Sequence, residues 1–347
     1  MLTRRSVLWA GAWATLITSA HARLNLRADV LEALKPSEKR RYRLGYLPVT
    51  CHLTCPVADY IKKSLNAPGR FEPIRFGGFP ELKEAFLARY TLATFILAPM
   101  AMALREQGVR VKIVYLGHRD GTAMMVHKDS AIVRIEDLAG KRVAVPNRFS
   151  NQRLLLFKAL RERGLSIKQV ELVEMPPPDM PAALYARAVD AITSGEPFMA
   201  QTELDGYGRV LYLTKDVWPN FISCVLAVHE DLMQTDRAGV QLLVDGIAQS
   251  GMWLDQKTDH RMQASQFVSK HYYNQHPRLL AHVLSKPPDR VKYTQLTPLR
   301  GDFEEIEALG REAGILNGTA HFEDYADPSF AERTSALRPF AWEAGTG

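Results

Sequence analysis

The sequence lacks the short motifs that mark the common classes of enzyme. A Walker A phosphate loop, the zinc-protease pattern H-E-x-x-H, the nucleophile elbow G-x-S-x-G and the dinucleotide fingerprint G-x-G-x-x-G are all absent from its 347 residues. Lysine and arginine form no basic block, and the formal net charge is only +6. Because nucleic-acid binding needs a concentrated basic surface, we expect no nucleic-acid partner. We also expect no catalysis and no cofactor.

Long apolar runs are also missing, and the one informative apolar stretch lies at the N-terminus. Arg4-Arg5 precedes an apolar run over residues 7–17, and Ala20-His21-Ala22 follows as an A-x-A cleavage pattern. This run is shorter than the roughly 20 residues that cross a bilayer. We therefore predict a signal peptide over residues 1–22, cleaved after Ala22, and a periplasmic mature chain that does not insert into a membrane. The paired arginines favour twin-arginine export.

The remaining sequence alternates short apolar runs with amphipathic stretches, a pattern typical of α/β proteins with mostly parallel sheets. Helical spacing of apolar residues predicts helices over Glu81–Tyr90 and Asn151–Arg163, and another over about 302–313. The predicted strands are Arg43–Val49, Phe71–Phe76, Leu92–Ala98, Val111–Leu116, Ala123–His127, Arg142–Val145, Val170–Met175, Ala191–Ser194, Arg209–Leu213 and Cys224–His229.

Several segments, taken together, resemble those of one group of proteins. The chain is similar to the nitrate, taurine and sulfonate group of ABC-importer binding proteins, which includes relatives that bind the pyrimidine precursor of thiamine. The segments that carry the resemblance are Leu44–Pro48, Leu97–Met100, Ile135–Pro146, Val189–Ala191, Gly195–Phe198, Leu309–Leu316 and Asp327–Ala331.

The resemblance implies a periplasmic-binding-protein fold of type II, with two doubly wound lobes and a cleft between them. We expect lobe 1 over 43–138 and about 228–345, and lobe 2 over 139–227. The implied function is a monomeric solute-binding protein that closes around a small anionic or polar heterocyclic ligand. It would deliver that ligand to an ABC permease with a cytoplasmic ATPase. A thiamine-pyrimidine-synthase-like enzyme is an alternative, although the cysteine-rich motif associated with those synthases is absent.

Candidate ligand-binding residues follow from the topology, because ligands of open α/β sheets lie beyond the carboxyl ends of the strands. Asn147–Gln152 joins a strand to a helix, where free backbone N–H groups favour an anion, and Arg148 or Arg153 would strengthen that preference. Ser150 or Asn151 alternatively only caps the helix. The full set of candidates is Thr50, Cys51, His52, Cys55, Pro99, Met100, Gly121, Thr122, Asn147, Ser150, Asn151, Gln152, Gly195 and Glu196.

Cysteine is scarce, and the three residues present are Cys51, Cys55 and Cys224. In an oxidising compartment an odd count leaves at least one thiol unpaired within the chain. Three interpretations stay open: a Cys51–Cys55 or Cys55–Cys224 disulfide, direct binding of a ligand or metal, and inert packing. The second would make the protein a periplasmic metal- or thiol-ligand receptor, with Cys51, His52 and Cys55 as candidate ligands for a soft metal.

Overall fold

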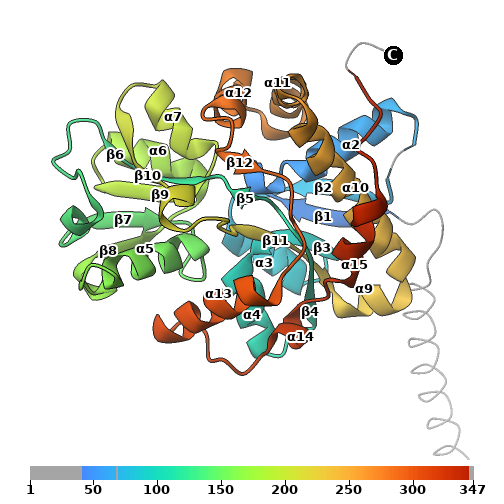
Figure 1. The fold of residues 1–347 in the computed structure, drawn as a ribbon, viewed down its shortest axis with the longest axis horizontal. Helices are drawn as coiled ribbons and strands as arrows, with labels where there is room; N and C mark the ends of the chain where they lie inside the picture. The colour runs from blue at the N-terminus through green and yellow to red at the C-terminus, as the bar shows by residue number, and fades with distance from the viewer. Residues whose placement is uncertain (1–40, 68, 344–347) are drawn as a thin grey trace, which may run out of the picture.

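The computed structural model describes residues 41–67 and 69–343, so the predicted signal peptide lies outside the described residues. Two five-stranded sheets form two lobes (Figure 1). We call the part built on the first sheet lobe 1 and the part built on the second sheet lobe 2. The first sheet has the order β2 (Phe71–Arg75), β1 (Tyr42–Tyr46), β3 (Ala93–Leu97), β11 (Cys224–His229), β4 (Val111–Leu116). The second has the order β10 (Gly208–Leu213), β6 (Thr122–His127), β9 (Ala191–Gly195), β7 (Arg142–Val145), β8 (Glu171–Glu174).

Helices surround both sheets. The α-helices are α2 (Thr54–Ser64), α3 (Phe79–Leu87), α4 (Ala98–Glu106), α5 (Asn151–Arg161), α6 (Met180–Tyr185), α7 (Phe198–Leu204), α8 (Thr214–Val217), α9 (Glu230–Thr235), α10 (Arg237–Gln256), α11 (Thr258–Val268), α12 (Pro277–Ser285), α13 (Arg300–Glu312), α14 (Phe322–Tyr325) and α15 (Ser329–Glu332). Short helices of other types are η1 (Thr50–His52), η2 (Ile135–Leu138), η3 (Ile167–Gln169), η4 (Pro177–Asp179), η5 (Ser269–Tyr273) and η6 (Arg333–Ala336). None of the helices in the described residues is long and apolar enough to span a bilayer.

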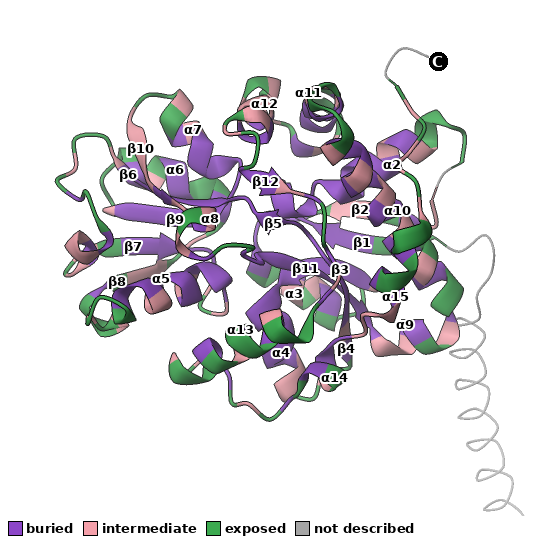
Figure 2. Ribbon diagram, in the orientation of Figure 1, coloured by how far each residue is buried: buried purple, intermediate pink, exposed green. Residues whose placement is uncertain are grey.

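All ten predicted strands are confirmed, with ends that differ by up to three residues. The largest difference is at β1, which ends at Tyr46 because the following segment contains Pro48, and proline has no N–H for a sheet ladder. The strands carry the core: every residue of β3, β9 and β11 is buried, and Figure 2 shows buried residues concentrated on both sheets. The alternation of apolar runs therefore predicted the sheets because these strands are covered on both faces.

Each sheet contains one antiparallel strand. In lobe 1, β11 pairs antiparallel with β3 and β4, while β1 pairs parallel with β2 and β3. In lobe 2, β6 pairs antiparallel with β9 and β10, while β7 pairs parallel with β8 and β9. Both β6 and β11 are the first strand that the chain forms after crossing from the other lobe. Each of these two strands enters its sheet from the end that faces the other lobe, so it is antiparallel to the strands on either side of it.

The crossings lie earlier than the predicted lobe boundaries. The chain leaves lobe 1 after Leu116 and enters lobe 2 at Thr122, whereas the prediction placed the change between residues 138 and 139. It returns before Cys224 instead of near residue 228. The segment around the predicted first boundary, residues 135–141, is polar and contains Gly140, and it forms η2 and a turn inside lobe 2.

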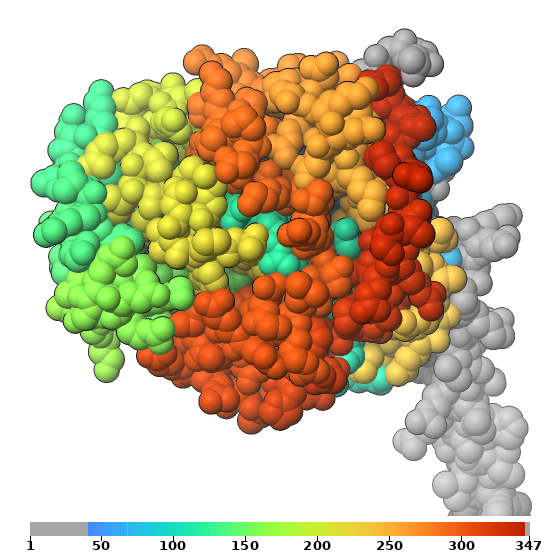
Figure 3. All heavy atoms as spheres, in the orientation of Figure 1, coloured from blue at the N-terminus to red at the C-terminus, as the bar shows by residue number. Residues whose placement is uncertain are grey.

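A third segment between the lobes, which contains β12 (Val291–Lys292), was not predicted. It pairs with β5 (Arg119–Asp120), which lies in the first crossing between β4 and β6. Both strands have only two residues and are too short for a hydrophobic pattern to reveal them. The segments that follow α11 continue this bridging on one face of the molecule, where they appear in orange to red and reach lobe 2 (Figure 3). Contacts of α12 with α7 and of α13 with α5 join the same two lobes.

Candidate functional site

The first loop of lobe 1 sits at the joint between the lobes. The loop residue Thr50 donates its backbone N–H to the carbonyl of Glu196 in lobe 2, at 2.7 Å. Its own carbonyl accepts the hydroxyl of Tyr293 at 3.0 Å, and its Oγ1 is hydrogen-bonded to Nε2 of His118 at 3.0 Å. All of these side chains are buried. Residues from both lobes and from two crossing segments therefore meet at Thr50.

Two glycines make this close packing possible. A Cβ placed on Gly117 would lie 2.3 Å from the carbonyl oxygen of Cys51 and 3.2 Å from that of Cys224. Gly121 has a φ of +65°, and a Cβ there would lie 2.5 Å from the ring of His118. Since backbone and a packed ring cannot give way easily, both positions require glycine. The predicted residue Gly121 thus shapes the site without a side chain of its own.

Cys51, His52 and Cys224 form a buried cluster whose nitrogen and sulfur atoms lie within 4.8 Å of one another. The sulfurs of Cys51 and Cys224 are 2.9 Å apart. Burial raises the pKa of the Cys51 thiol, but the contact with Cys224 and the nearby His52 ring outweigh it, so this pKa lies well below its ordinary value. Cys51 is therefore the thiol of this cluster that carries thiolate character.

The cluster in the structure differs by one residue from the candidate metal ligands Cys51, His52 and Cys55. Cys55 lies in α2, outside the cluster, and burial raises the pKa of its thiol well above the ordinary value. Cys224, which begins β11, takes its place beside Cys51 and His52. All three cysteines are free thiols, so neither the Cys51–Cys55 nor the Cys55–Cys224 disulfide is present.

The segment between β7 and α5 supplies amide side chains to the joint. The Nδ2 of Asn151 donates to the carbonyl of Ile222, and Nε2 of Gln152 donates to Ser223 Oγ at 3.0 Å and to Thr122 Oγ1 at 3.3 Å. Asn151 Oδ1 and Gln152 Oε1 are buried and have no hydrogen-bond partner in the described part of the chain. These two oxygens are acceptors that a ligand with N–H or O–H groups would satisfy.

Ser150 acts as the N-cap of α5, because its Oγ accepts the backbone N–H of Arg153 at 3.2 Å. We predict that Ser150→Ala lowers the free energy of unfolding by about 1 kcal/mol, because a backbone donor loses its acceptor. Ser150→Asn restores a capping side chain and should recover most of this loss. Urea denaturation of the three proteins measures it, and an equal loss in both variants would contradict the capping role.

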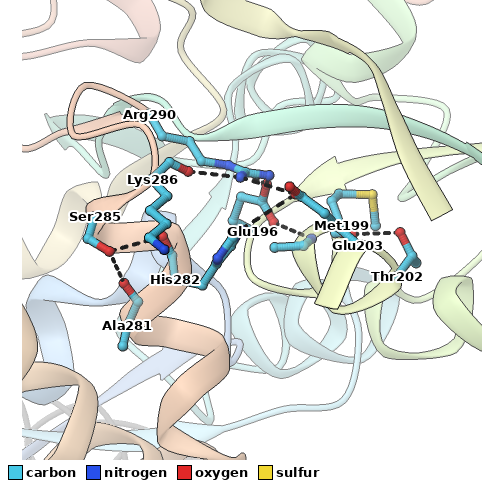
Figure 4. Close-up of polar contacts among 10 residues, drawn as sticks. Glu196, Met199, Thr202, Glu203, Ala281, His282, Ser285, Lys286 and Arg290 are labelled. Atoms are coloured by element: carbon cyan, nitrogen blue, oxygen red, sulfur yellow. Dashed lines mark hydrogen bonds and ion pairs between the residues drawn. The ribbon is translucent and has the colours of Figure 1, made fainter. Parts of the chain in front are cut away.

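Glu196, predicted as a ligand-binding residue, is fully engaged by the protein itself (Figure 4). Its Oε1 accepts Nε of Arg290 at 2.9 Å and also Nη2 of the same residue, and its Oε2 accepts the backbone N–H of Ala200 at 2.8 Å. Arg290 also donates to the carbonyl of Lys286 at 3.1 Å and lies 3.6 Å from the carboxylate of Glu203. The carboxylate of Glu196 thus ties lobe 2 to the segment that follows α12.

Beside this joint, two adjoining hollows open between α4 of lobe 1 and the end of β7 in lobe 2. Their volumes are about 530 and 330 Å³, and Arg148, Phe149 and Glu174 line both. Met100 and Asn147 line the smaller hollow, whereas Pro99 is buried at the start of α4.

The larger hollow is lined by two arginines, Arg148 and Arg153, and by two carboxylates, Glu106 and Glu174. Arg148 lies over the ring of Phe149, 4.6 Å from its centroid. Arg153 donates Nη1 to the carbonyl of Arg148 at 3.1 Å, while its buried Nε has no acceptor among the described residues. Burial lowers the pKa of Arg153; the carboxylate of Glu174 acts against this, and the charge of Arg148 lowers the pKa further. An anion in this hollow would therefore be stabilised by both charges.

The structure thus gathers Thr50, Cys51, His52, Gly121, Gly195 and Glu196 at the joint, and Thr122 with Asn151 and Gln152 beside them. Sequence reasoning missed His118, Tyr293 and Arg290. His118 had a usable signal, because it lies two residues after the predicted strand Val111–Leu116, where ligand-binding loops begin. Tyr293 and Arg290 lie in the helical C-terminal part of the sequence, where no motif distinguished them.

Comparison with known proteins agrees with this architecture. The model of the NMT1-like family matches residues 35–269, which is more than half of the chain. The chain belongs to the NMT1-like family. The taurine-binding periplasmic protein of Escherichia coli K12 is 32% identical over 109 residues, which cover 31% of this chain and 33% of that protein. A putative aliphatic sulfonates-binding protein of the same organism is 31% identical over 180 residues, covering 50% of this chain and 55% of that protein.

A solved member of the same fold covers more of the NMT1-like chain. The ligand-binding component of an ABC-type import system from Staphylococcus aureus, with zinc bound, superposes with a TM-score of 0.77. It has 24% sequence identity, and the superposition covers 86% of this chain and 100% of that one. The predicted periplasmic-binding-protein fold of type II is confirmed. The aligned parts span between a third and about half of the two Escherichia coli relatives, both of which are named as binding proteins.

Proposed function

We propose that this chain is the extracytoplasmic solute-binding component of an ABC importer and has no catalytic activity. It closes its lobes around a small ligand and presents that ligand to a membrane permease driven by a cytoplasmic ATPase. Family membership and the names of the relatives support the class of function. The observation that carries the proposal is the hollow between α4 and the β7–α5 segment, because it is lined by both lobes.

The lining of this hollow favours a small anion or a polar ligand with one anionic group. Arg148 and Arg153 supply positive charge, and the unpartnered Nε of Arg153 supplies a directed donor. The two carboxylates of the hollow are held by backbone donors: Glu174 accepts the N–H of Arg148 at 3.0 Å. Glu106 accepts the N–H of Asn317 at 2.9 Å and that of Gly318 at 2.6 Å, which leaves the directed donors of the hollow to the arginines. Closing the lobes would remove water from the ligand and strengthen these charged contacts.

We predict that Arg153→Met weakens anion binding about 10- to 100-fold, the range expected for losing a hydrogen bond to a charged group. Calorimetric titration with taurine, methanesulfonate, nitrate and bicarbonate measures it. Arg163→Met is the matched control, because Arg163 bonds the carbonyl of Ala159 and lies 3.5 Å from Glu136, away from the hollow. If the wild type binds one of these anions and Arg153→Met binds it with the same affinity, the proposed site is wrong.

A further inference from the structure

Cys51 and Cys224 come from distant parts of the chain and meet at the joint between the lobes. Cys51 belongs to η1 after β1, and Cys224 is the first residue of β11, directly after the return crossing. Their side chains are 1% and 0% exposed, and the sulfurs are 2.9 Å apart. Gly117 lies beside the carbonyls of both residues, so the two backbones also approach closely. The fold therefore holds both the sulfurs and the backbones of the two cysteines close together.

A metal ion is not the best partner for these sulfurs. His52, the third member of the cluster, accepts the backbone N–H of Leu47 at its Nδ1, at 2.7 Å. A neutral imidazole whose Nδ1 accepts a hydrogen bond carries its proton on Nε2, and neither nitrogen then has a lone pair free for a metal. Only two sulfurs remain, whereas structural zinc sites use four ligands with Zn–S distances of about 2.3 Å. Two sulfurs on one tetrahedral zinc lie about 3.8 Å apart, and these lie at 2.9 Å.

The His52 ring instead suits a thiolate. Its Nε2 is buried and has no acceptor in the described structure, and the sulfur of the adjacent Cys51 lies within 4.8 Å of a nitrogen of this ring. The lowered pKa of Cys51 is consistent with this arrangement, and thiolate is the form that attacks disulfides. The thiol of Cys55 has the opposite setting in α2, beside the carboxylate of Asp59. The position of the His52 ring beside Cys51 therefore favours Cys51 as the nucleophile of the pair and Cys224 as the resolving thiol.

We propose that Cys51 and Cys224 form a disulfide as the chain folds, by exchange with a protein or small-molecule disulfide before the pair is fully buried. The Cys51 thiolate attacks one sulfur of the oxidant, forms a mixed disulfide and releases one thiolate. The sulfur of Cys224 then attacks Cys51 and displaces the second thiolate, and the proton of Cys224 passes to a released thiolate. The two cysteines lose two electrons, and the oxidant is reduced to one thiol and one thiolate, which takes its proton from water. Cys55 stays reduced.

The bond would act where the lobes meet. A Cβ on Gly195 of lobe 2 would lie 3.8 Å from the sulfur of Cys51, and the neighbouring Thr50 bonds lobe 2 through Glu196. The disulfide would anchor this loop to β11 and replace a thiolate by an uncharged group at the contact. It closes a loop of 173 residues, so it also restricts the unfolded chain strongly. The inference does not depend on the identity of the transported ligand.

The test is to refold the full chain from urea in reduced and oxidised glutathione, then alkylate it under denaturing, non-reducing conditions. Peptide mapping should show Cys51 linked to Cys224 and Cys55 alkylated. Dithiothreitol should lower the thermal midpoint on the order of 5–10 °C. Cys55→Ser should respond like the wild type, whereas Cys51→Ser and Cys224→Ser should not respond.

Three outcomes would overturn the proposal. One is complete alkylation of all three cysteines after refolding in the glutathione mixture. Another is a bond that includes Cys55. The third is one equivalent of copper or zinc in the natively purified protein that is lost in both Cys51→Ser and Cys224→Ser. If Cys51→Ser fails to fold, Cys51→Ala with the same mapping decides between a missing bond and a misfolded loop.

Discussion

Arg290→Ala is expected to lower the free energy of unfolding by about 3–5 kcal/mol, the range for breaking one partner of a buried ion pair. The guanidinium is 3% exposed and the carboxylate of Glu196 is fully buried, so the substitution leaves an uncompensated charge between the lobes. One hydrogen bond from Ala200 would remain on that carboxylate. Urea denaturation of the variant and the wild type measures the difference.

The matched control is Arg161→Ala, which removes another ion pair between the lobes. Arg161 of α5 pairs with Glu312 of α13, but the two side chains are 44% and 48% exposed. Solvent screens this pair, so we expect a loss below about 1 kcal/mol. Glu196→Gln should fall between the two variants, because the amide still accepts and donates hydrogen bonds. Equal losses for Arg290→Ala and Arg161→Ala would show that the buried pair does not hold the lobes together.

Gly117→Ala is expected to lower the free energy of unfolding by about 1–3 kcal/mol, the usual effect of adding a group to a well-packed site. The new Cβ would meet the carbonyl of Cys51 at 2.3 Å, and that atom belongs to backbone. The η1 loop must therefore move, which would weaken the hydrogen bond from Thr50 to Glu196 across the joint. Ligand affinity should fall together with stability.

Gly301→Ala is the control for this substitution. Gly301 lies in α13, and no heavy atom of the described residues comes within 4 Å of a Cβ placed there. Because alanine favours helix more than glycine does, this variant should be slightly more stable than the wild type. Chemical denaturation and calorimetry on both variants measure the two effects. If Gly117→Ala has the stability and the ligand affinity of the wild type, the η1 loop accommodates a Cβ at this position and the predicted clash is wrong.

The sheets were predictable from the sequence because their strands are short apolar runs covered on both faces. The lobe boundaries were not, because a crossing is defined by which strands pair, and β6 has the same apolar character as the strands of lobe 1. The two-residue strands β5 and β12 carry no periodic signal at all. The lobe boundaries thus depend on strand pairing between distant parts of the sequence, which local patterns do not reveal.

The residues of the candidate site were also only partly predictable, because local patterns do not reveal contacts between distant segments. Strand ends indicated Thr50, Gly121 and Gly195, because loops gather at the carboxyl edge of such sheets, and the structure brings these three residues together at the joint between the lobes. Glu196 was placed at the joint, but its partner Arg290 lies 94 residues away and no local pattern connects them. The pairing of Cys51 with Cys224 instead of Cys55 likewise depends on where β11 enters the first sheet.

The place of β11 also sets an order of assembly during synthesis. It lies between β3 and β4, both of which leave the ribosome before any residue of lobe 2. Lobe 2 takes its sheet from one continuous stretch, residues 122–213, and can complete it as soon as that stretch has emerged. Until residues 224–229 follow, β3 and β4 have unpaired edges that can bind other chains. The lobe that begins the chain is therefore the last to close its sheet.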